Sequence, residues 1–74
     1  MDALLERASG EVIGIEVKAA ETVTGADFHG LRHLADRLGD KFTAGFVLHL
    51  GNQSLPFGDR MRALPLSALW EAAA

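Results

Sequence analysis

Residues 14–18 constrain the fold of this chain most, because they place two charged side chains within an apolar strand. Side chains alternate across a strand, so Glu16 and Lys18 lie on the same face. Charged residues are seldom buried without a partner. The pattern therefore has two interpretations, an ion pair on a solvated face or a metal-dependent phosphodiesterase site. The other face is purely apolar and carries Ile13, Ile15, Val17 and Ala19.

The composition excludes several classes of protein. The 74 residues form one small domain, residues 1–74, and a core of that size supplies roughly 3–5 kcal/mol of net stability at best. The chain has no cysteine, so we expect neither a disulfide nor a thiolate metal site, and we expect a cytoplasmic location. No apolar run reaches the roughly 18 residues that span a bilayer, and no signal peptide is evident, so we expect no membrane association. The net charge of −3 differs from the basic surface of most nucleic-acid-binding proteins.

The order in which strand-like and helix-like patterns of apolar residues follow along the chain predicts a mixed α/β fold. Strands joined by a tight turn run antiparallel, whereas strands joined through a helix usually run parallel. The chain therefore predicts a β-β-α-β core with a mixed sheet, followed by a short edge strand, which Pro65 suits, and a helical turn. The expected strands are residues 3–7, 11–20, 42–50 and 62–66, and the expected helical segments are residues 25–38 and 68–72.

The longer predicted helix has signals at both ends. Thr24 and Asp27 form an acidic capping box at its start, and Gly39 is placed to end it. We expect its apolar stripe to pack on the face of the second strand that lacks Glu16 and Lys18. The stripe consists of Phe28, Leu31, Leu34, Ala35 and Leu38. The third strand is expected to present one apolar face made of Phe42, Ala44, Phe46, Leu48 and Leu50.

The turn between the first two strands predicts their register. A three-residue loop with Gly10 in a left-handed conformation pairs Leu5 with Ile13, apolar with apolar. The same register sets the carboxylates of Asp2 and Glu16 across the ladder, with Cβ atoms about 5 Å apart. Like charges at this distance destabilise the pair unless a cation bridges them or one group is protonated.

The chain carries an acidic residue, then a turn, and then a Glu-x-Lys motif on the next strand. This arrangement, made here by Asp2, Glu16 and Lys18, resembles the core of PD-(D/E)XK nucleases. The remaining chain is similar to the C-terminal domain of unknown function of a bacterial AAA-type ATPase family, itself similar to restriction-endonuclease folds. The resemblance implies a fragment that lacks the first helix and first strand of that fold, and an AAA-type ATPase as a partner. The segments that carry it are residues 15–19, 30–32, 48–51, 55–60 and 64–70.

The resemblance implies a metal-dependent nuclease site. Asp2, Glu16 and the carbonyl of Val17 would hold Mg²⁺ or Mn²⁺, because these ions prefer oxygen ligands. Lys18 would orient or deprotonate the attacking water. Asp2, Glu16 and Lys18 are therefore the candidate catalytic residues. We expect the isolated chain to be inactive, since catalytic geometry tolerates little displacement.

Other polar and aromatic residues have simpler interpretations. His29 and His33 have a spacing that can bind a metal from one helix face, but no third ligand is evident and two solvated histidines are expected. We expect Trp70 to close the core, with an interface anchor as the alternative. His49 is expected to be packed or half-exposed. The loop charges are expected to be solvated, namely Asp59, Arg60 and Arg62.

Two classes of function stay open. The first is a nuclease-like domain, active or vestigial. The second is a non-catalytic interaction module that docks on an ATPase partner or on itself. Because 49% of the residues are hydrophobic and a truncated sheet exposes an edge, we expect a homodimer, formed by edge pairing or by exchange of the terminal segment around Trp70. A nucleic-acid partner would need either a divalent cation to offset the negative charge or help from chain outside these residues.

Overall fold

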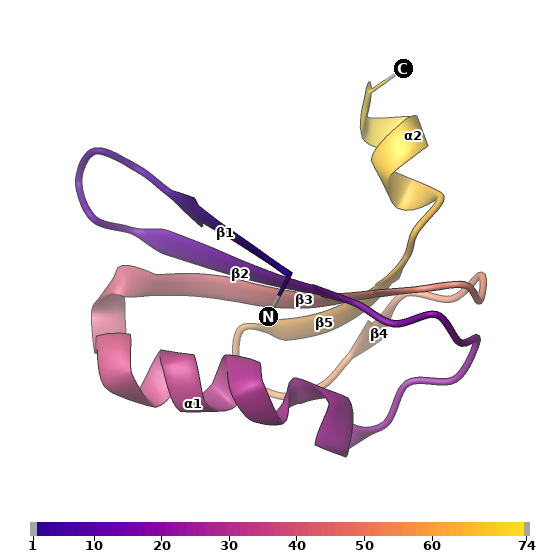
Figure 1. The fold of residues 1–74 in the computed structure, drawn as a ribbon, viewed down its shortest axis with the longest axis horizontal. Helices are drawn as coiled ribbons and strands as arrows, with labels where there is room; N and C mark the ends of the chain where they lie inside the picture. Colours follow the sequence, from indigo (N-terminus) through magenta and orange to yellow (C-terminus); the bar gives the residue numbers. More distant parts are fainter. Residues whose placement is uncertain (1, 74) are drawn as a thin grey trace.

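The computed structural model describes residues 2–73, which form one five-stranded mixed sheet and two α-helices (Figure 1). The strands are β1 (Ala3–Glu6), β2 (Val12–Val17), β3 (Phe42–His49), β4 (Leu55–Pro56) and β5 (Met61–Pro65). Their order across the sheet is β1-β2-β3-β5-β4. Strands β2, β3 and β5 run parallel, while β1 and β4 are antiparallel to their neighbours. The mixed α/β fold predicted from the sequence is confirmed.

The predicted long helix is present and begins as a 3₁₀ turn. The 3₁₀ segment Gly25–Phe28 leads into α1 (His29–Leu38), and a second 3₁₀ segment, Gly39–Lys41, precedes β3. The capping box forms as expected, with the Thr24 N–H donating to Asp27 Oδ2 at 2.8 Å. Gly39 ends α1 with a positive φ of 56°. The terminal helix is α2 (Ala68–Ala73).

The register predicted for the β1–β2 hairpin is confirmed. Gly10 has a φ of 92°, as a three-residue loop requires. Leu5 pairs with Ile13 and Ala3 pairs with Ile15. The Arg7 N–H donates to the Glu11 carbonyl at 2.9 Å and closes the loop. Local turn chemistry therefore fixes this part of the fold.

The last predicted strand is not at the edge of the sheet. Residues 55–56, which lie outside every strand and helix predicted from the sequence, form β4 and pair with β5, so β5 lies between β3 and β4. Pro65 is the final residue of β5, and the ladder continues when the Leu66 N–H donates to the His49 carbonyl at 2.7 Å. The proline that occupies an edge position is Pro56 in β4.

Helix α1 covers the face of the sheet opposite to the expected one. A Cβ atom added to Gly30 of α1 would lie 3.1 Å from Oε1 of Glu16. One added to Gly45, which pairs with Gly14, would lie 3.3 Å from the Cβ of Leu31. The helix therefore packs on the face of Glu16 and Lys18, and the prediction that it covers the purely apolar face is wrong.

The start of β3 also departs from the predicted alternation. The register between β2 and β3 shifts between Val12, which pairs with Phe42, and Ile13, which pairs with Ala44. Because Thr43 is the extra residue, Phe42 turns to the helix face instead of sharing a face with Ala44. A large aromatic side chain thus joins the helix-covered core. The buried core cluster contains Phe28, Leu31, Ala35, Phe42, Val47, Met61 and Ala63.

Neither helix of residues 2–73 covers the other face of the sheet in this way. Figure 1 shows α1 on one side of the sheet and α2 projecting from the opposite side. Ile13, Ile15 and Phe46 on this face are only half-buried, and Val17 is 50% exposed. Trp70 in α2 is 77% exposed, so the expectation that it closes the core is wrong.

Arg60 is more than a solvated loop charge. Its Nη1 donates to the carbonyls of Gly39 at 2.9 Å and Phe42 at 2.6 Å, and its guanidinium lies 5.3 Å from the centre of the Phe42 ring. Its Nε also donates to Asp59. Arg60 therefore joins the segment before β5 to the connection between α1 and β3, and it does so with a positive φ of 62°.

Candidate functional site

Asp2 lies at the open end of the β1–β2 hairpin, and its carboxylate binds the backbone of β2. The Asp2 N–H donates to the Ile15 carbonyl at 3.1 Å, and Asp2 Oδ2 accepts from the Val17 N–H at 2.6 Å. The regular ladder of the described residues ends at the pair Ala3–Ile15. Asp2 therefore does not pair with Glu16 across the ladder as expected, because its N–H bonds one residue earlier on β2.

The carbonyl of Val17 lies on the same side of β2 as Asp2. The Lys18 N–H donates to the Leu48 carbonyl at 2.8 Å, so the backbone of Lys18 faces β3. Successive residues of a strand direct their N–H and C=O groups to opposite edges. The backbone groups of Val17 consequently face the β1 edge, where Asp2 already binds its N–H.

Lys18 forms an ion pair with Asp27 at the start of the helical segment. Its Nζ lies 2.6 Å from Asp27 Oδ2, and both side chains are half-buried. The hydrogen bond from Lys18, followed by that from the Thr24 N–H, holds the pKa of Asp27 below its ordinary value of 3.8. The sequence identified Asp27 only as a helix cap, because nothing in the spacing shows that β2 and the cap meet.

Glu16 is half-buried beneath α1, with Oε1 close to Gly30. The structure therefore brings Glu16 and Lys18 to the helix-covered face, and it places Asp2 at the end of the same hairpin. Two carboxylates and a backbone carbonyl are oxygen donors of the type that Mg²⁺ and Mn²⁺ bind. Among the residues that the structure describes, no three His, Cys, Asp or Glu side chains converge as a metal site.

The two helical histidines and Trp70 have exposed side chains. His29 and His33 are exposed on α1, as expected for solvated side chains. Trp70 and Leu69 are exposed because α2 leaves the sheet after β5, and the hydrogen bonds of its first turn are local, such as Trp70 N–H to Ser67 O at 3.1 Å. An interface role for Trp70 stays a prediction.

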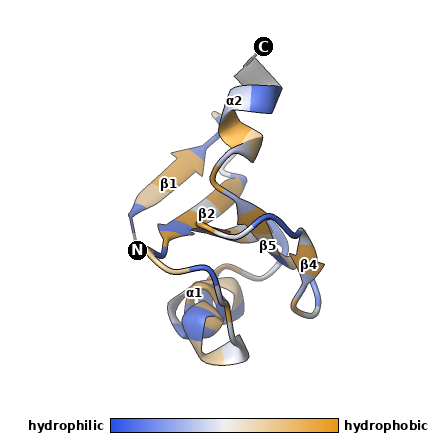
Figure 2. Cartoon of the chain, turned by 90° about the vertical axis from the view of Figure 1, so that its right-hand side faces the viewer, coloured by the Kyte–Doolittle hydropathy of each residue, from blue (hydrophilic) through white to orange (hydrophobic). Residues whose placement is uncertain are grey.

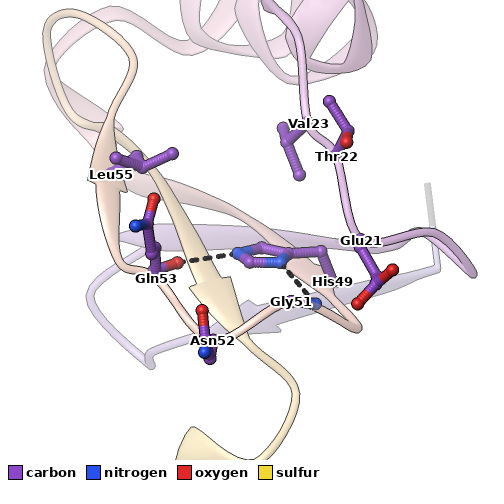
Figure 3. A pocket seen from close by; sticks show the side chains of 8 residues that line it. All are labelled: Glu21, Thr22, Val23, His49, Gly51, Asn52, Gln53 and Leu55. Atoms are coloured by element: carbon purple, nitrogen blue, oxygen red, sulfur yellow. Dashed lines mark hydrogen bonds between the residues drawn. The ribbon is translucent and has the colours of Figure 1, made fainter.

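A pocket of about 350 Å³ opens at the carboxyl ends of β2 and β3 (Figure 3). Open α/β sheets commonly bind ligands at this edge. Its walls come from two loops that the sequence analysis did not connect, one after β2 and one between β3 and β4. The lining residues are Glu21, Thr22, Val23, His49, Gly51, Asn52, Gln53 and Leu55.

His49 in this pocket holds the loop that follows β3. The Gly51 N–H donates to His49 Nδ1 at 3.0 Å, so this nitrogen carries no proton. Nε2 therefore donates to the Gln53 carbonyl at 2.9 Å, and Figure 3 shows both contacts. The imidazole is only 3% exposed and has both nitrogens in backbone contacts. Its role is structural, consistent with the packed histidine expected from the sequence.

The two edges of the sheet differ in protection. All four residues of β1 are exposed, including Leu4 at 56% and Leu5 at 55%. Figure 1 shows β1 at the margin of the sheet, and Figure 2 shows it as a largely hydrophobic strand. The opposite edge strand, β4, has two residues and contains Pro56. Of the two edge strands among residues 2–73, β1 is therefore the longer and carries no proline.

These features define a small mixed α/β domain with a one-sided helical cover and one open hydrophobic edge. The chain belongs to the family described as Domain of unknown function (DUF4143), whose model matches residues 1–69. No curated protein and no solved structure matches the chain. The expected domain of unknown function is confirmed, whereas the nuclease relationship and the ATPase context stay predictions.

The described part of the chain contains no helix long and apolar enough to cross a membrane.

Proposed function

We propose that this domain is a non-catalytic interaction module that binds a second copy of itself through β1. The proposal rests on the contrast between the edges of the sheet, because β1 is open and hydrophobic while β4 is short and contains Pro56. Open strand edges pair with other strands, and proline and short length discourage such pairing. The open strand is the same in each copy, and antiparallel pairing about a two-fold axis gives a closed dimer.

The exposed leucines supply the driving force for this association. Leu4 and Leu5 point to opposite faces of β1, and each is more than half exposed. Fully burying a leucine is worth about 1.5–3 kcal/mol, so each of these side chains can contribute about 1 kcal/mol on pairing. An interface made of one short strand from each copy is small, and we therefore expect dissociation constants in the micromolar range.

Sedimentation equilibrium at protein concentrations from about 1 to 200 µM tests the proposal. The average mass should rise from 7.9 kDa towards twice that value. Leu5→Lys should keep the chain monomeric, because a charge on an edge strand opposes pairing. Leu55→Lys is the matched control on β4, where the leucine is 39% exposed, and it should dimerise as the wild type does.

Three results would separate the alternatives. A single species of 7.9 kDa at every concentration contradicts the proposal. A dimer that persists in Leu5→Lys but is lost in Trp70→Ala indicates exchange of the terminal segment instead of edge pairing. Far-UV circular dichroism of each variant confirms that the fold is retained, which both leucine positions should permit since they are exposed.

A second candidate function is metal-dependent phosphodiester hydrolysis, favoured by the position of Asp2 beside the backbone of Val17. Asp2, Glu16 and the Val17 carbonyl would hold Mg²⁺ or Mn²⁺, and the bound ion would act as a Lewis acid towards a phosphoryl oxygen. Lys18 would have to leave Asp27 before its ammonium could orient a water molecule. The AAA-type ATPase partner and the cytoplasmic location stay predictions under either function.

Amide NMR with added Mn²⁺ tests this second candidate. A paramagnetic ion should broaden the signals of residues 2 and 16–18 at submillimolar concentration, and Glu16→Ala should abolish the effect. Glu11→Gln, which removes an exposed carboxylate elsewhere on the hairpin, is the matched control and should leave the broadening unchanged. Absence of localised broadening at millimolar Mn²⁺ would exclude a metal site here.

A further inference from the structure

The outward-facing backbone groups of β1 belong to Leu4 and Glu6. The Arg7 N–H donates to the Glu11 carbonyl, so the backbone of Arg7 faces β2. Because these groups alternate along a strand, the backbone of Leu5 also faces β2. Leu4 and Glu6 consequently present their N–H and C=O groups to the open side.

Asp2 adds no donor to this outer edge. Its N–H turns inward and donates to the Ile15 carbonyl at 3.1 Å. Leu4 and Glu6 are therefore the residues of β1 whose N–H and C=O groups can both pair with a second β1 strand. This restriction leaves three symmetric antiparallel registers, in which Leu4, Leu5 or Glu6 lies on the two-fold axis.

Hydrogen bonding and charge both favour the register with Leu5 on the two-fold axis. With Leu5 on the axis, Leu4 pairs with Glu6 of the second copy, and every outward N–H and C=O group of both residues is used. With Leu4 on the axis, Glu6 lies opposite Asp2 of the second copy. With Glu6 on the axis, the two Glu6 carboxylates oppose each other. Like charges directly across a ladder are destabilising.

We infer that two copies of this chain pair antiparallel through β1 with Leu5 on the two-fold axis, an inference that rests on the proposed self-association. The axis is perpendicular to the sheet, so both α1 helices lie on the same side of one continuous sheet. The helix-free faces of the two copies, which carry Ile13, Ile15 and Phe46, then join into one apolar surface.

The register predicts a specific disulfide. Since the backbone of Leu5 faces β2, the two Leu5 residues form a non-hydrogen-bonded pair, with Cα atoms about 4.5 Å apart. This separation lies within the range that a disulfide spans, about 4.4–6.8 Å. Leu4 lies opposite Glu6 of the second copy, and its own counterpart is displaced along the strand beyond that range.

Oxidative cross-linking of single-cysteine variants tests the register. The chain has no cysteine of its own, so any disulfide comes from the introduced residue. Leu5→Cys should form covalent dimers at least ten-fold faster than Leu4→Cys, as followed by non-reducing gel electrophoresis. In urea, which abolishes the fold, the two rates should become equal.

Mixed variants provide a second readout if Leu5→Cys weakens association. The same register sets Ala3 opposite Arg7 of the second copy. A mixture of Ala3→Cys and Arg7→Cys should therefore yield the mixed disulfide in preference to either homodimer. Unconstrained cross-linking of equimolar variants gives twice as much mixed disulfide as either homodimer, so an excess no larger than this would contradict the register.

The possible failures are distinguishable. Faster cross-linking of Leu4→Cys than of Leu5→Cys would overturn the register and place Leu4 on the axis. A dimer by sedimentation with no rapid cross-link in any variant would overturn pairing through β1 and leave self-association standing. A monomer at all concentrations, together with cross-linking no faster than in urea, would overturn both.

Discussion

Replacing Gly45 with alanine should destabilise the domain by about 1–3 kcal/mol, the usual cost of overpacking a core. The new Cβ would lie 2.7 Å from Sδ of Met61, 3.0 Å from Cζ of Phe42 and 3.3 Å from Cβ of Leu31. Carbon atoms pack best at about 3.5–4.0 Å. All three neighbours are buried, so none can move aside without displacing the core.

The expected loss is large compared with the stability of such a small domain. A core of this size supplies roughly 3–5 kcal/mol, and each kcal/mol shifts Tm by about 4–8 °C in a domain of 60–100 residues. We therefore expect Tm to fall by roughly 4–24 °C. The midpoint of urea unfolding should fall in parallel, with an unchanged slope.

Urea unfolding followed by far-UV circular dichroism measures the effect. Trp70 is 77% exposed, which makes its fluorescence a poor reporter of unfolding. All variants must be compared at one protein concentration, because self-association adds to the apparent stability. Gly25→Ala is the matched control, since the atom nearest to its new Cβ is Nη1 of Arg32 at 3.9 Å, and it should change stability by less than about 0.5 kcal/mol.

Equal stability of Gly45→Ala and Gly25→Ala would refute the reasoning. Such a result would mean that α1 does not press on Gly45, and the assignment of the helix to the Glu16 face would then be wrong.

Three further variants test contacts outside the core of the sheet. The pKa of Asp27 lies below 3.8, chiefly because Lys18 donates to its carboxylate. The ionised Asp27 therefore stabilises the fold above about pH 4, and this stabilisation is lost as the pH falls through the folded pKa. Urea midpoints should decrease below about pH 4 in the wild type and much less in Asp27→Asn. His49→Leu should leave two backbone groups of the following loop without partners, at about 1–3 kcal/mol each, and amide hydrogen exchange of residues 51–53 should accelerate. Arg60→Lys should cost about 1 kcal/mol in urea unfolding, since one ammonium cannot reproduce two carbonyl contacts and the stacking on Phe42.

The elements that local chemistry determines were predictable from the sequence. Gly10 permits the left-handed turn that sets the hairpin register, and Thr24 with Asp27 marks the start of the helical segment. The apolar stripe of α1 was also predicted, since helical spacing depends only on nearby residues. In each case the residues that decide the structure are close in sequence.

The features that depend on distant contacts were not predictable in the same way. The bulge at Thr43 turns Phe42 towards α1, and alternation alone assigns Phe42 to the wrong face. The short β4 strand exists only because Leu55 pairs with Ala63. The contact between Lys18 and Asp27 crosses nine positions of chain and depends on where the helical segment meets β2.

The ion pair between Lys18 and Asp27 engages an ammonium that any other role of Lys18 would also require. As long as Lys18 neutralises the helix cap, it secures the beginning of the helical segment to β2. Any chemistry that recruited the same ammonium would expose the Asp27 charge and weaken that attachment. Use of Lys18 in catalysis would then loosen the start of the helical segment, and a firmly held helix start would withdraw Lys18 from catalysis.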